Sequence, residues 1–432
     1  MPFLYPLLSH IMNYCLYAFV FTLPLEEAPA NITGGLFLLG SLALTMLSAR
    51  WLKSLDLIDY VTIGLMIAMI SAAAISGFNS RFTDWGSLEH WREWISWSAI
   101  VLVPLFMLIH LRERPVAIDG VLKAALLGGV VAIIDAWVQW KWGAGGQYPQ
   151  LRSLGHVNQS AMYVVALVPV IAYLWFVASS IRWRAAGIGA LVLILLTLEP
   201  MRSVIAAAVV AALLIGYITC YAWLLQSSTR AFLVFALSMI GSVLIFYVLV
   251  ILDSALMAES VARVTNADGN GFWSKRDELL NSALLVVQQF PLFGGGLSTF
   301  GSVVAPSELA NLLNTNGLHY IADADLFSSS HGHSVFTNTL VERGWLGLVS
   351  LTLYFVWFSA LSGRFVFFGR GGSERISAVL LASAVLTIIT GGIGNTTFHN
   401  EHGQLMSITL ICFYLLMRLQ RTTNPSDTRR SA

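Results

Sequence analysis

The sequence predicts an all-α polytopic membrane protein with about twelve transmembrane helices and one long, partly helical outer loop. Only 11% of the 432 residues are charged, against roughly 25% in soluble globular domains, and 57% are hydrophobic. Apolar runs of about 20 residues, the length that crosses a bilayer, recur along the chain. This composition excludes an ordinary cytosolic enzyme, a disordered chain and a nucleic-acid-binding domain, so membrane lipids are the expected surroundings.

Twelve apolar segments are the candidate spans. No basic region or small-residue cleavage site accompanies the first of them, so it is expected to be retained rather than removed as a signal peptide. The seventh is short, and only residues 199–202 separate it from the eighth, which predicts a tight helical hairpin. The candidate spans are 9–25, 32–49, 57–77, 94–111, 120–142, 158–180, 185–198, 203–225, 231–252, 344–362, 376–393 and 403–417.

The basic residues predict the orientation of these spans. When the loops are assigned alternately to two sides, fifteen Lys and Arg residues fall on one side and nine on the other. The richer side is expected to be cytoplasmic, which places both termini in the cytoplasm. The outer basic residues are exceptions to this charge bias, so the presence of each on the outer side requires an explanation. They are Arg81, Arg92, Lys141, Arg152, Arg202, Arg263, Lys275, Arg276 and Arg343.

One long outer loop divides the chain into three regions. They are residues 1–252 with nine spans, the loop at 253–330, and residues 331–432 with three spans and a cytoplasmic tail. A loop of this length in a compact protein is usually functional or disordered. Ser274 with Asp277 is typical of a helix start, and apolar residues at helical spacing continue to Phe290. The glycines at 294–296 are expected to end this helix or to let a ligand approach the backbone closely.

Histidines gather on the outer side of the predicted topology. His333 follows His331 where the long loop enters the tenth span. Histidine is a natural general base near neutral pH, and the alternative is a histidine that only caps a helix. The pairs at 331–333 and 399–402 have no accompanying acid or cysteine at ligand spacing. Neither a metal nor another cofactor is therefore expected.

Arg202 lies in the tight outer turn between two spans. An arginine at membrane depth costs about 2.5–3.5 kcal/mol on insertion scales, so it requires a partner. The partner is either Glu199 or an anionic ligand, because arginine bonds phosphate oxygens in a bidentate manner. A second polar segment, at the outer entrance of the sixth span, contains Arg152, His156 and Asn158.

Lys275 and Arg276 lie in the first turn of the helix predicted to begin at Ser274. The free N–H groups of a helix N-terminus suit a phosphate ligand. Because the surrounding loop is acidic, such a site would have to be local. The alternative is that these two cations pair with Asp277 or Glu278.

Four blocks of sequence occur in a fixed order. From His333 the chain reads His-Ser, nine residues, Gly344, two residues and Gly347. This stretch resembles the His-[Asn/Ser/Gln]-x9-Gly-x2-[Gly/Thr/Tyr] signature of bacterial O-antigen ligases. Three earlier blocks also look like those of this family, and they are residues 155–161, 200–203 and 276–296. With the spans and the long loop, the resemblance covers most of the chain.

The resemblance implies a GT-C-like glycosyltransferase of the bacterial inner membrane with its active site facing the periplasm. The implied donor is an O-antigen polysaccharide on undecaprenyl pyrophosphate, and the implied acceptor is the lipid A–core oligosaccharide of lipopolysaccharide. By carry-over, His333 matches the catalytic histidine, and Arg202 and Arg276 match two arginines that bind pyrophosphate. A third cation and four supporting side chains complete the expected site, and they are Arg152, His331, Lys275, His156 and Asn158.

Other functions are compatible with the same sequence. O-antigen polymerases and protein O-oligosaccharyltransferases share the superfamily and differ in the acceptor. A transporter or flippase for lipid-linked sugars is the alternative from a different class. It predicts ionisable residues near the middle of the bilayer, whereas the polar candidates here lie at the outer edge. Asp135 is the main exception, and it either pairs locally with Lys141, which is the favoured interpretation, or marks a proton path.

Overall fold

The structure is a computed structural model. All the regular secondary structure in its described residues is helical. It describes residues 4–47, 55–80, 88–112, 114–143, 149–154, 157–177, 180–198, 213, 216, 284, 287, 290–297, 334–369, 372–394 and 400–422. The helices are α1 (Leu4–Thr22), α2 (Glu27–Leu47), α4 (Leu57–Asn79), α5 (Leu88–Leu111), α6 (Pro115–Trp142), α7 (Val157–Ala166), α8 (Val168–Phe176), α9 (Ile181–Leu198), α16 (Val335–Phe368), α17 (Gly372–Gly394) and α18 (Asn400–Thr422).

The predicted fold class is confirmed. In the described part of the chain, nine helices are long and apolar enough to cross a membrane. They overlap nine of the predicted spans. α1 overlaps the first predicted span but is not among the nine. Apart from Leu213 and Gly216, the predicted spans at 203–225 and 231–252 lie outside the described residues, so the count of twelve stays a prediction.

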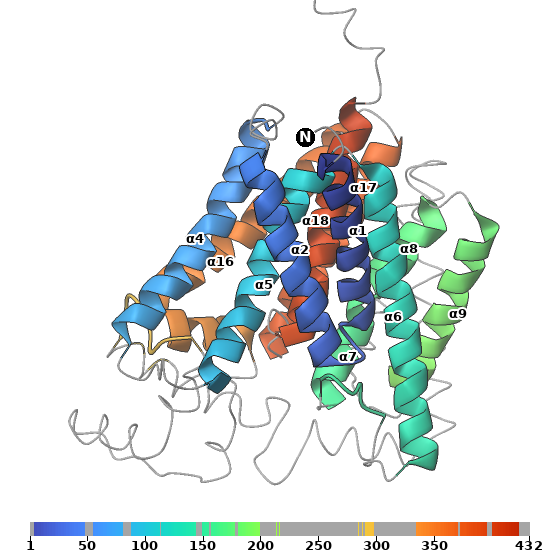
Figure 1. The fold of residues 1–432 in the computed structure, drawn as a ribbon, viewed down its shortest axis with the longest axis horizontal. Helices are drawn as coiled ribbons and strands as arrows, with labels where there is room; N and C mark the ends of the chain where they lie inside the picture. The colour runs from blue at the N-terminus through green and yellow to red at the C-terminus, as the bar shows by residue number, and fades with distance from the viewer. Residues whose placement is uncertain are drawn as a thin grey trace, which may run out of the picture.

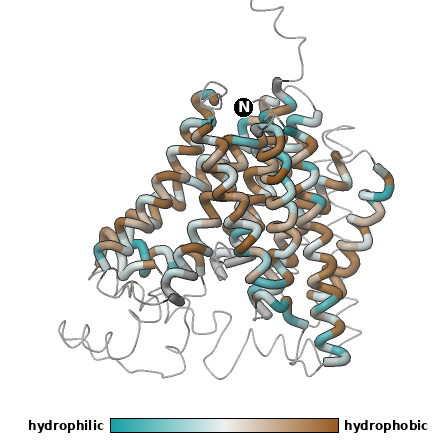
Figure 2. The backbone as a smooth tube through the Cα atoms, viewed as in Figure 1, coloured by the Kyte–Doolittle hydropathy of each residue, from teal (hydrophilic) through white to brown (hydrophobic). Residues whose placement is uncertain are grey.

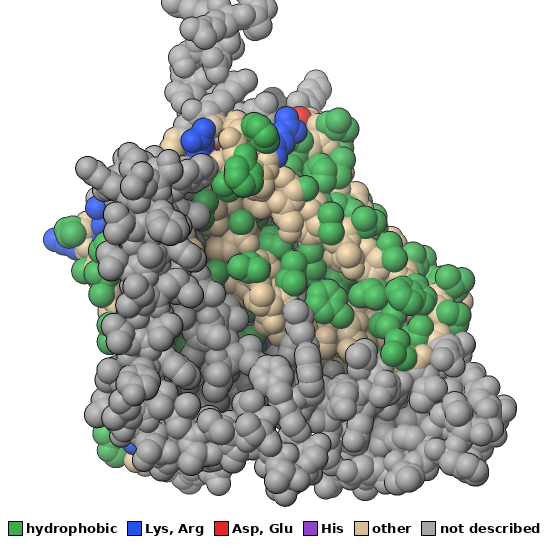
Figure 3. Space-filling model, turned by 180° about the vertical axis from the view of Figure 1, so that it is seen from behind, with side chains coloured by type: hydrophobic (Ala, Val, Ile, Leu, Met, Phe, Trp, Pro, Cys, Tyr) green, Lys and Arg blue, Asp and Glu red, His purple; other side chains and the backbone are tan. Residues whose placement is uncertain are grey.

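The helices form a bundle whose flank is hydrophobic and whose upper end carries charged side chains. Figure 1 shows the N-terminus and the end of α18 at the same end of the bundle. Hydrophobic residues follow one another along the helices in Figure 2. In the view from behind, hydrophobic side chains cover the described flank, and Lys and Arg side chains gather near its upper rim (Figure 3). This is the distribution expected for a protein that contacts acyl chains along its sides and water at its ends.

α18 is the central helix of the described bundle. It contacts α5, α6, α7 and α17, and 94% of its span is buried inside the protein. This position explains why its span is the least apolar of the nine. Its polar side chains meet other helices instead of lipid: Gln404 Nε2 donates to the Ser96 carbonyl at 3.1 Å, and Ser407 bonds the Ile100 carbonyl. Polar residues inside a membrane are tolerated where they face the bundle interior.

Two of the predicted spans differ from the observed helices for identifiable reasons. α9 begins at Ile181, four residues before the predicted span, because Arg182 and Arg184 interrupt the apolar run but not the helix. The sixth predicted span is two helices, α7 and α8, which meet at Leu167. Pro169 lies two residues into α8, where its missing N–H group breaks the ladder of hydrogen bonds between them.

Candidate functional site

The helix that follows His333 begins at the end of the bundle opposite the termini (Figure 1). Ser334 is extended, with φ −149° and ψ 136°, and α16 starts at the next residue. The Ser334 hydroxyl donates to the Gly392 carbonyl near the end of α17 at 3.0 Å. His331 and His333 lie outside the described residues. The bond from Ser334 to Gly392 therefore holds the start of α16, directly after His333, against the end of α17.

α16 is broken at Gly344. This residue has φ 61° and ψ −161°, so α16 consists of a short helix at 335–343 and a longer one at 345–368. The short helix is buried along its length. It corresponds to the nine-residue spacer of the sequence block that begins at His333. The tenth predicted span, 344–362, begins at this break.

The segment 290–297 from the long outer loop fills the break with backbone hydrogen bonds. The N–H groups of Gly295 and Gly296 donate to the carbonyls of Val341 and Glu342, at 2.7 and 2.8 Å. On the other side, the N–H groups of Trp345 and Leu346 donate to the carbonyls of Pro291 and Leu292, at 2.9 and 3.1 Å. The last carbonyls of one helix and the first N–H groups of the next, which would otherwise lack partners, are thus bonded. We refer to residues 290–297 and 341–346 as the glycine joint.

Two glycines make the close approach in the glycine joint possible. A Cβ atom on Gly344 would lie 2.5 Å from the Leu292 carbonyl oxygen, and one on Gly294 would lie 2.5 Å from the Arg343 nitrogen. Both residues also have positive φ, which favours glycine. The glycines at 294–296 were expected to end a helix or to admit a ligand. Leu284 and Val287 are helical and Phe290 is a bend, so the described chain is no longer helical when it reaches these glycines. The backbone that approaches Gly294 is the chain's own.

α4 holds the glycine joint from the side. The Ser76 hydroxyl donates to the Glu342 carbonyl, and the Ser80 hydroxyl, just after the end of α4, donates to the Gly295 carbonyl. The contact from Ser76 reaches the segment 341–346, and the contact from Ser80 reaches the segment 290–297. α4 therefore fixes the loop segment and the broken helix together.

Arg343 points into the protein beside the break. The residue is only 5% exposed, and its Nη2 donates to the Thr339 hydroxyl at 2.7 Å. Its guanidinium carbon lies 4.8 Å from the ring centroid of Trp97 in α5, a cation–π contact. A Cβ atom on Gly347 would lie 2.2 Å from the Arg343 Cβ. Gly347 thus leaves the space in which the Arg343 side chain turns inward.

Of the predicted site residues, the structure describes Arg152 and the backbone of Asn158. Arg152 is exposed, and its Nη1 lies 2.8 Å from the Glu26 carboxylate. Asn158 lies in the first turn of α7. Leu151, beside Arg152, donates its N–H to the Ser160 hydroxyl at 3.0 Å, which ties this segment to α7. The other predicted site residues lie outside the described residues, and they are His156, Arg202, Lys275, Arg276, His331 and His333.

Asp135 does not meet its expected partner. Its carboxylate accepts a hydrogen bond from Gln139 Nε2 at 2.6 Å, one helical turn along α6. The Lys141 ammonium instead lies 3.7 Å from the ring centroid of Trp140. Local pairing was expected and is found, but with an amide in place of the ammonium group.

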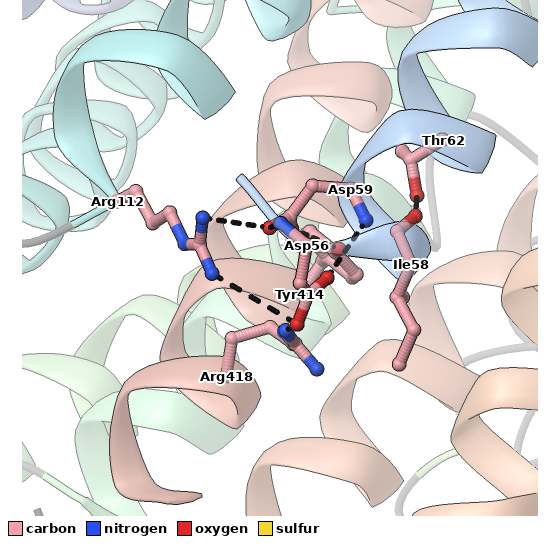
Figure 4. A network of polar contacts seen from close by, with 7 residues as sticks. All are labelled: Asp56, Ile58, Asp59, Thr62, Arg112, Tyr414 and Arg418. Carbon is pink, nitrogen blue, oxygen red and sulfur yellow. Dashed lines mark hydrogen bonds and ion pairs between the residues drawn. The ribbon is translucent and has the colours of Figure 1, made fainter. Parts of the chain in front are cut away.

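A polar network that the sequence did not predict joins α4 and α18 to Arg112, the residue directly after α5 (Figure 4). It lies where α4 begins, at the end of the bundle near the N-terminus (Figure 1). Arg112 Nη1 lies 2.8 Å from the Asp59 carboxylate, and the Tyr414 hydroxyl donates to the other oxygen of Asp59 at 2.6 Å. Arg418 bonds Asp56, and Asp56 with Asp59 forms a capping box at the start of α4. The spacing of the two acids was the available signal. The network holds three helices in register and contains none of the predicted site residues.

The comparisons with known proteins concern the region that contains the glycine joint. A protein-family model described as O-antigen ligase matches residues 201–352. The matched range includes both segments of the joint, together with Arg202, Arg276 and His333. A comparison with curated proteins finds no match.

Proposed function

We propose that this chain is an O-antigen ligase. It transfers a polysaccharide from undecaprenyl pyrophosphate to a sugar hydroxyl of the lipid A–core oligosaccharide. The family match over residues 201–352 supports its membership in the O-antigen ligase superfamily. The glycine joint is the observation that carries the proposal. It brings two of the four ligase-like blocks into backbone contact, one from the long loop and one from α16.

In this proposal His333 is the general base. It takes the proton from the acceptor hydroxyl while the acceptor oxygen attacks the anomeric carbon. The bond from that carbon to the pyrophosphate oxygen breaks, and the anomeric centre is inverted in a single displacement. General-base catalysis contributes typically 10²–10⁴-fold. The position of the catalytic group is supported by Ser334, which ties the start of α16 to α17.

Arg202 and Arg276 bind the pyrophosphate in this proposal. The leaving group carries its charge throughout, so two guanidinium groups stabilise the charge that develops in the transition state without a metal ion. Arg152 is a weaker third candidate, and Lys275, His331, His156 and Asn158 are supporting groups. The pairing of Arg152 with Glu26 does not exclude this role. The pair is exposed, and surface ion pairs contribute only about 0–1 kcal/mol.

The proposed location is the bacterial inner membrane, with the glycine joint at the periplasmic side. The nine candidate membrane helices support membrane embedding. The common end at which the chain begins and α18 finishes (Figure 1) supports an even number of spans. The predicted excess of basic residues at that end supports a cytoplasmic location for both termini.

The test is transfer by the purified protein reconstituted with lipid-linked polysaccharide. One reaction contains lipid A–core as the acceptor, and a second contains another lipid-linked glycan. We expect product in the first reaction only. Product in the second alone would make the protein a polymerase, and passage of the donor across the bilayer without product would make it a flippase.

Variants of the wild-type protein test the residue roles in the same assay. His333→Ala is expected to abolish transfer while donor binding is retained. Turnover by this variant would refute the assignment of His333 as the general base. Arg202→Lys and Arg276→Lys are expected to lose activity, because a point charge does not replace a bidentate fork. Normal activity of both lysine variants would refute the pyrophosphate assignment.

A further inference from the structure

A cavity of about 400 Å³ lies among α6, α8, α9 and α18. α6 begins beside it and α18 ends beside it, so it lies at the end of the bundle that holds the termini (Figure 1). None of the predicted site residues contributes to it. Its wall includes Val116, Asp119, Lys123, Tyr173, Trp183 and Leu416.

One wall of the cavity is a fixed pair of opposite charges. The Lys123 ammonium forms an ion pair with the Asp119 carboxylate, four residues earlier on α6. The Tyr173 hydroxyl donates to the other oxygen of Asp119 at 3.0 Å. The Lys123 nitrogen also lies 5.1 Å from the ring centroid of Trp183. Both charges are therefore held in place at the cavity by contacts with neighbouring helices.

The charged pair remains accessible to a ligand. About a quarter of each side chain is exposed, 25% for Lys123 and 28% for Asp119. An ammonium group has three N–H donors, and Lys123 uses one of them in its bond to Asp119. The remaining donors suit an anionic oxygen, and the carboxylate suits a second, cationic group.

The edge of the cavity at Val116 is apolar and faces outward. Val116 lines the cavity and is 82% exposed, and Ile181, the residue after the lining residue Ser180, is 74% exposed. Exposed aliphatic side chains at the ends of membrane helices contact acyl chains. A ligand of this cavity therefore meets a charged wall on one side and lipid on the other.

We propose that this cavity binds the headgroup of a zwitterionic aminophospholipid. The lipid phosphate accepts hydrogen bonds from Lys123, its primary ammonium donates to Asp119, and its acyl chains leave the cavity along Val116. A headgroup that carries both charges complements both members of the pair. A purely anionic headgroup would be attracted by Lys123 and repelled by Asp119, so it binds more weakly.

The test measures lipid retention by the full chain. The protein is delipidated in detergent and titrated with phosphatidylethanolamine or phosphatidylglycerol, and bound lipid is counted by native mass spectrometry. We expect one tightly bound phosphatidylethanolamine and weaker binding of phosphatidylglycerol. Lys123→Ala is expected to weaken the binding of phosphatidylethanolamine about tenfold or more, the effect of one charge-assisted hydrogen bond. Lys123→Arg keeps the charge and is expected to bind nearly as wild type.

The matched control is Lys141→Ala. Lys141 also lies over a tryptophan ring, at 3.7 Å from the centroid of Trp140, but near the other end of α6 and outside the cavity. This variant is expected to retain the lipid. Equal retention by Lys123→Ala and wild type, equal loss in Lys123→Ala and Lys141→Ala, or tighter binding of phosphatidylglycerol would each overturn the proposal.

Discussion

Replacement of Gly344 by alanine tests whether the glycine joint holds the two parts of α16 together. The backbone at this residue has φ 61° and ψ −161°, a region that is almost restricted to glycine. The new methyl group would lie 2.5 Å from the Leu292 carbonyl oxygen. That oxygen accepts the hydrogen bond from the Leu346 N–H group, so a movement of the oxygen away from the methyl group breaks this bond.

The expected loss follows from two costs. The backbone conformation costs about 1–3 kcal/mol for a residue with a side chain. If the loop segment moves away, the two hydrogen bonds from Trp345 and Leu346 are lost, at about 0.5–1.5 kcal/mol each. Together these effects lower the free energy of unfolding by roughly 2–6 kcal/mol. This is a large part of the 5–15 kcal/mol that typically separates folded from unfolded proteins.

The assay is thermal unfolding in detergent, followed by tryptophan fluorescence. The matched control is Gly363→Ala, which lies in the same helix and where, apart from the neighbouring backbone of that helix, no atom lies within 4 Å of the new methyl group. This control is expected to unfold at the wild-type temperature or slightly above it, since alanine is the better helix former. Gly344→Ala is expected to unfold several degrees lower. Equal unfolding temperatures for the two variants would refute our account of the joint.

Three further predictions concern other contacts and the proposed chemistry. Arg343→Ala is expected to lower the free energy of unfolding by about 2 kcal/mol, because the face of Trp97 loses a desolvated cation; an unchanged unfolding curve would contradict this. Asp59→Asn leaves the Arg112 guanidinium without its closest counter-charge and is expected to cost about 3 kcal/mol, whereas Tyr414→Phe removes one hydrogen bond and is expected to cost about 1 kcal/mol. Unfolding in detergent measures both, and the reverse order would contradict the ion pair. Transfer activity is expected to survive EDTA, and a strict requirement for added divalent metal would count against stabilisation by arginine alone.

The membrane helices were predictable from the sequence because hydropathy and length report the cost of placing residues in lipid. The order of the helices in space was not, since hydropathy averages over a helix. α18 shows the difference: its span has the lowest hydropathy of the nine found in the described chain, yet it is the most buried of them. The same averaging hid the network at Asp59, whose partners come from α5 and α18.

The glycine joint was predictable in part. The glycines at 294–296 indicated a position where the backbone is approached closely, whereas Gly344 was noted only as part of the sequence block that begins at His333. The sequence did not identify the approaching group, because two segments far apart in the chain supply it to each other. Arg343 was assigned to the outer basic residues by topology alone. Its burial on Trp97 depends on the inward turn beside Gly344, which no local pattern in the sequence reveals.

The glycine joint constrains some positions of the loop segment, where the backbone must approach closely, and leaves the side chains at other positions free to vary. Four hydrogen bonds between residues 291–296 and α16 join main-chain atoms, so these bonds impose no choice of side chain except glycine at the two points of closest approach. Leu292 and Phe293 extend outward from this fixed frame, with 61% and 37% of their surfaces exposed. A loop anchored in this way can carry different side chains at its surface while the helix after His333 remains held at the same place.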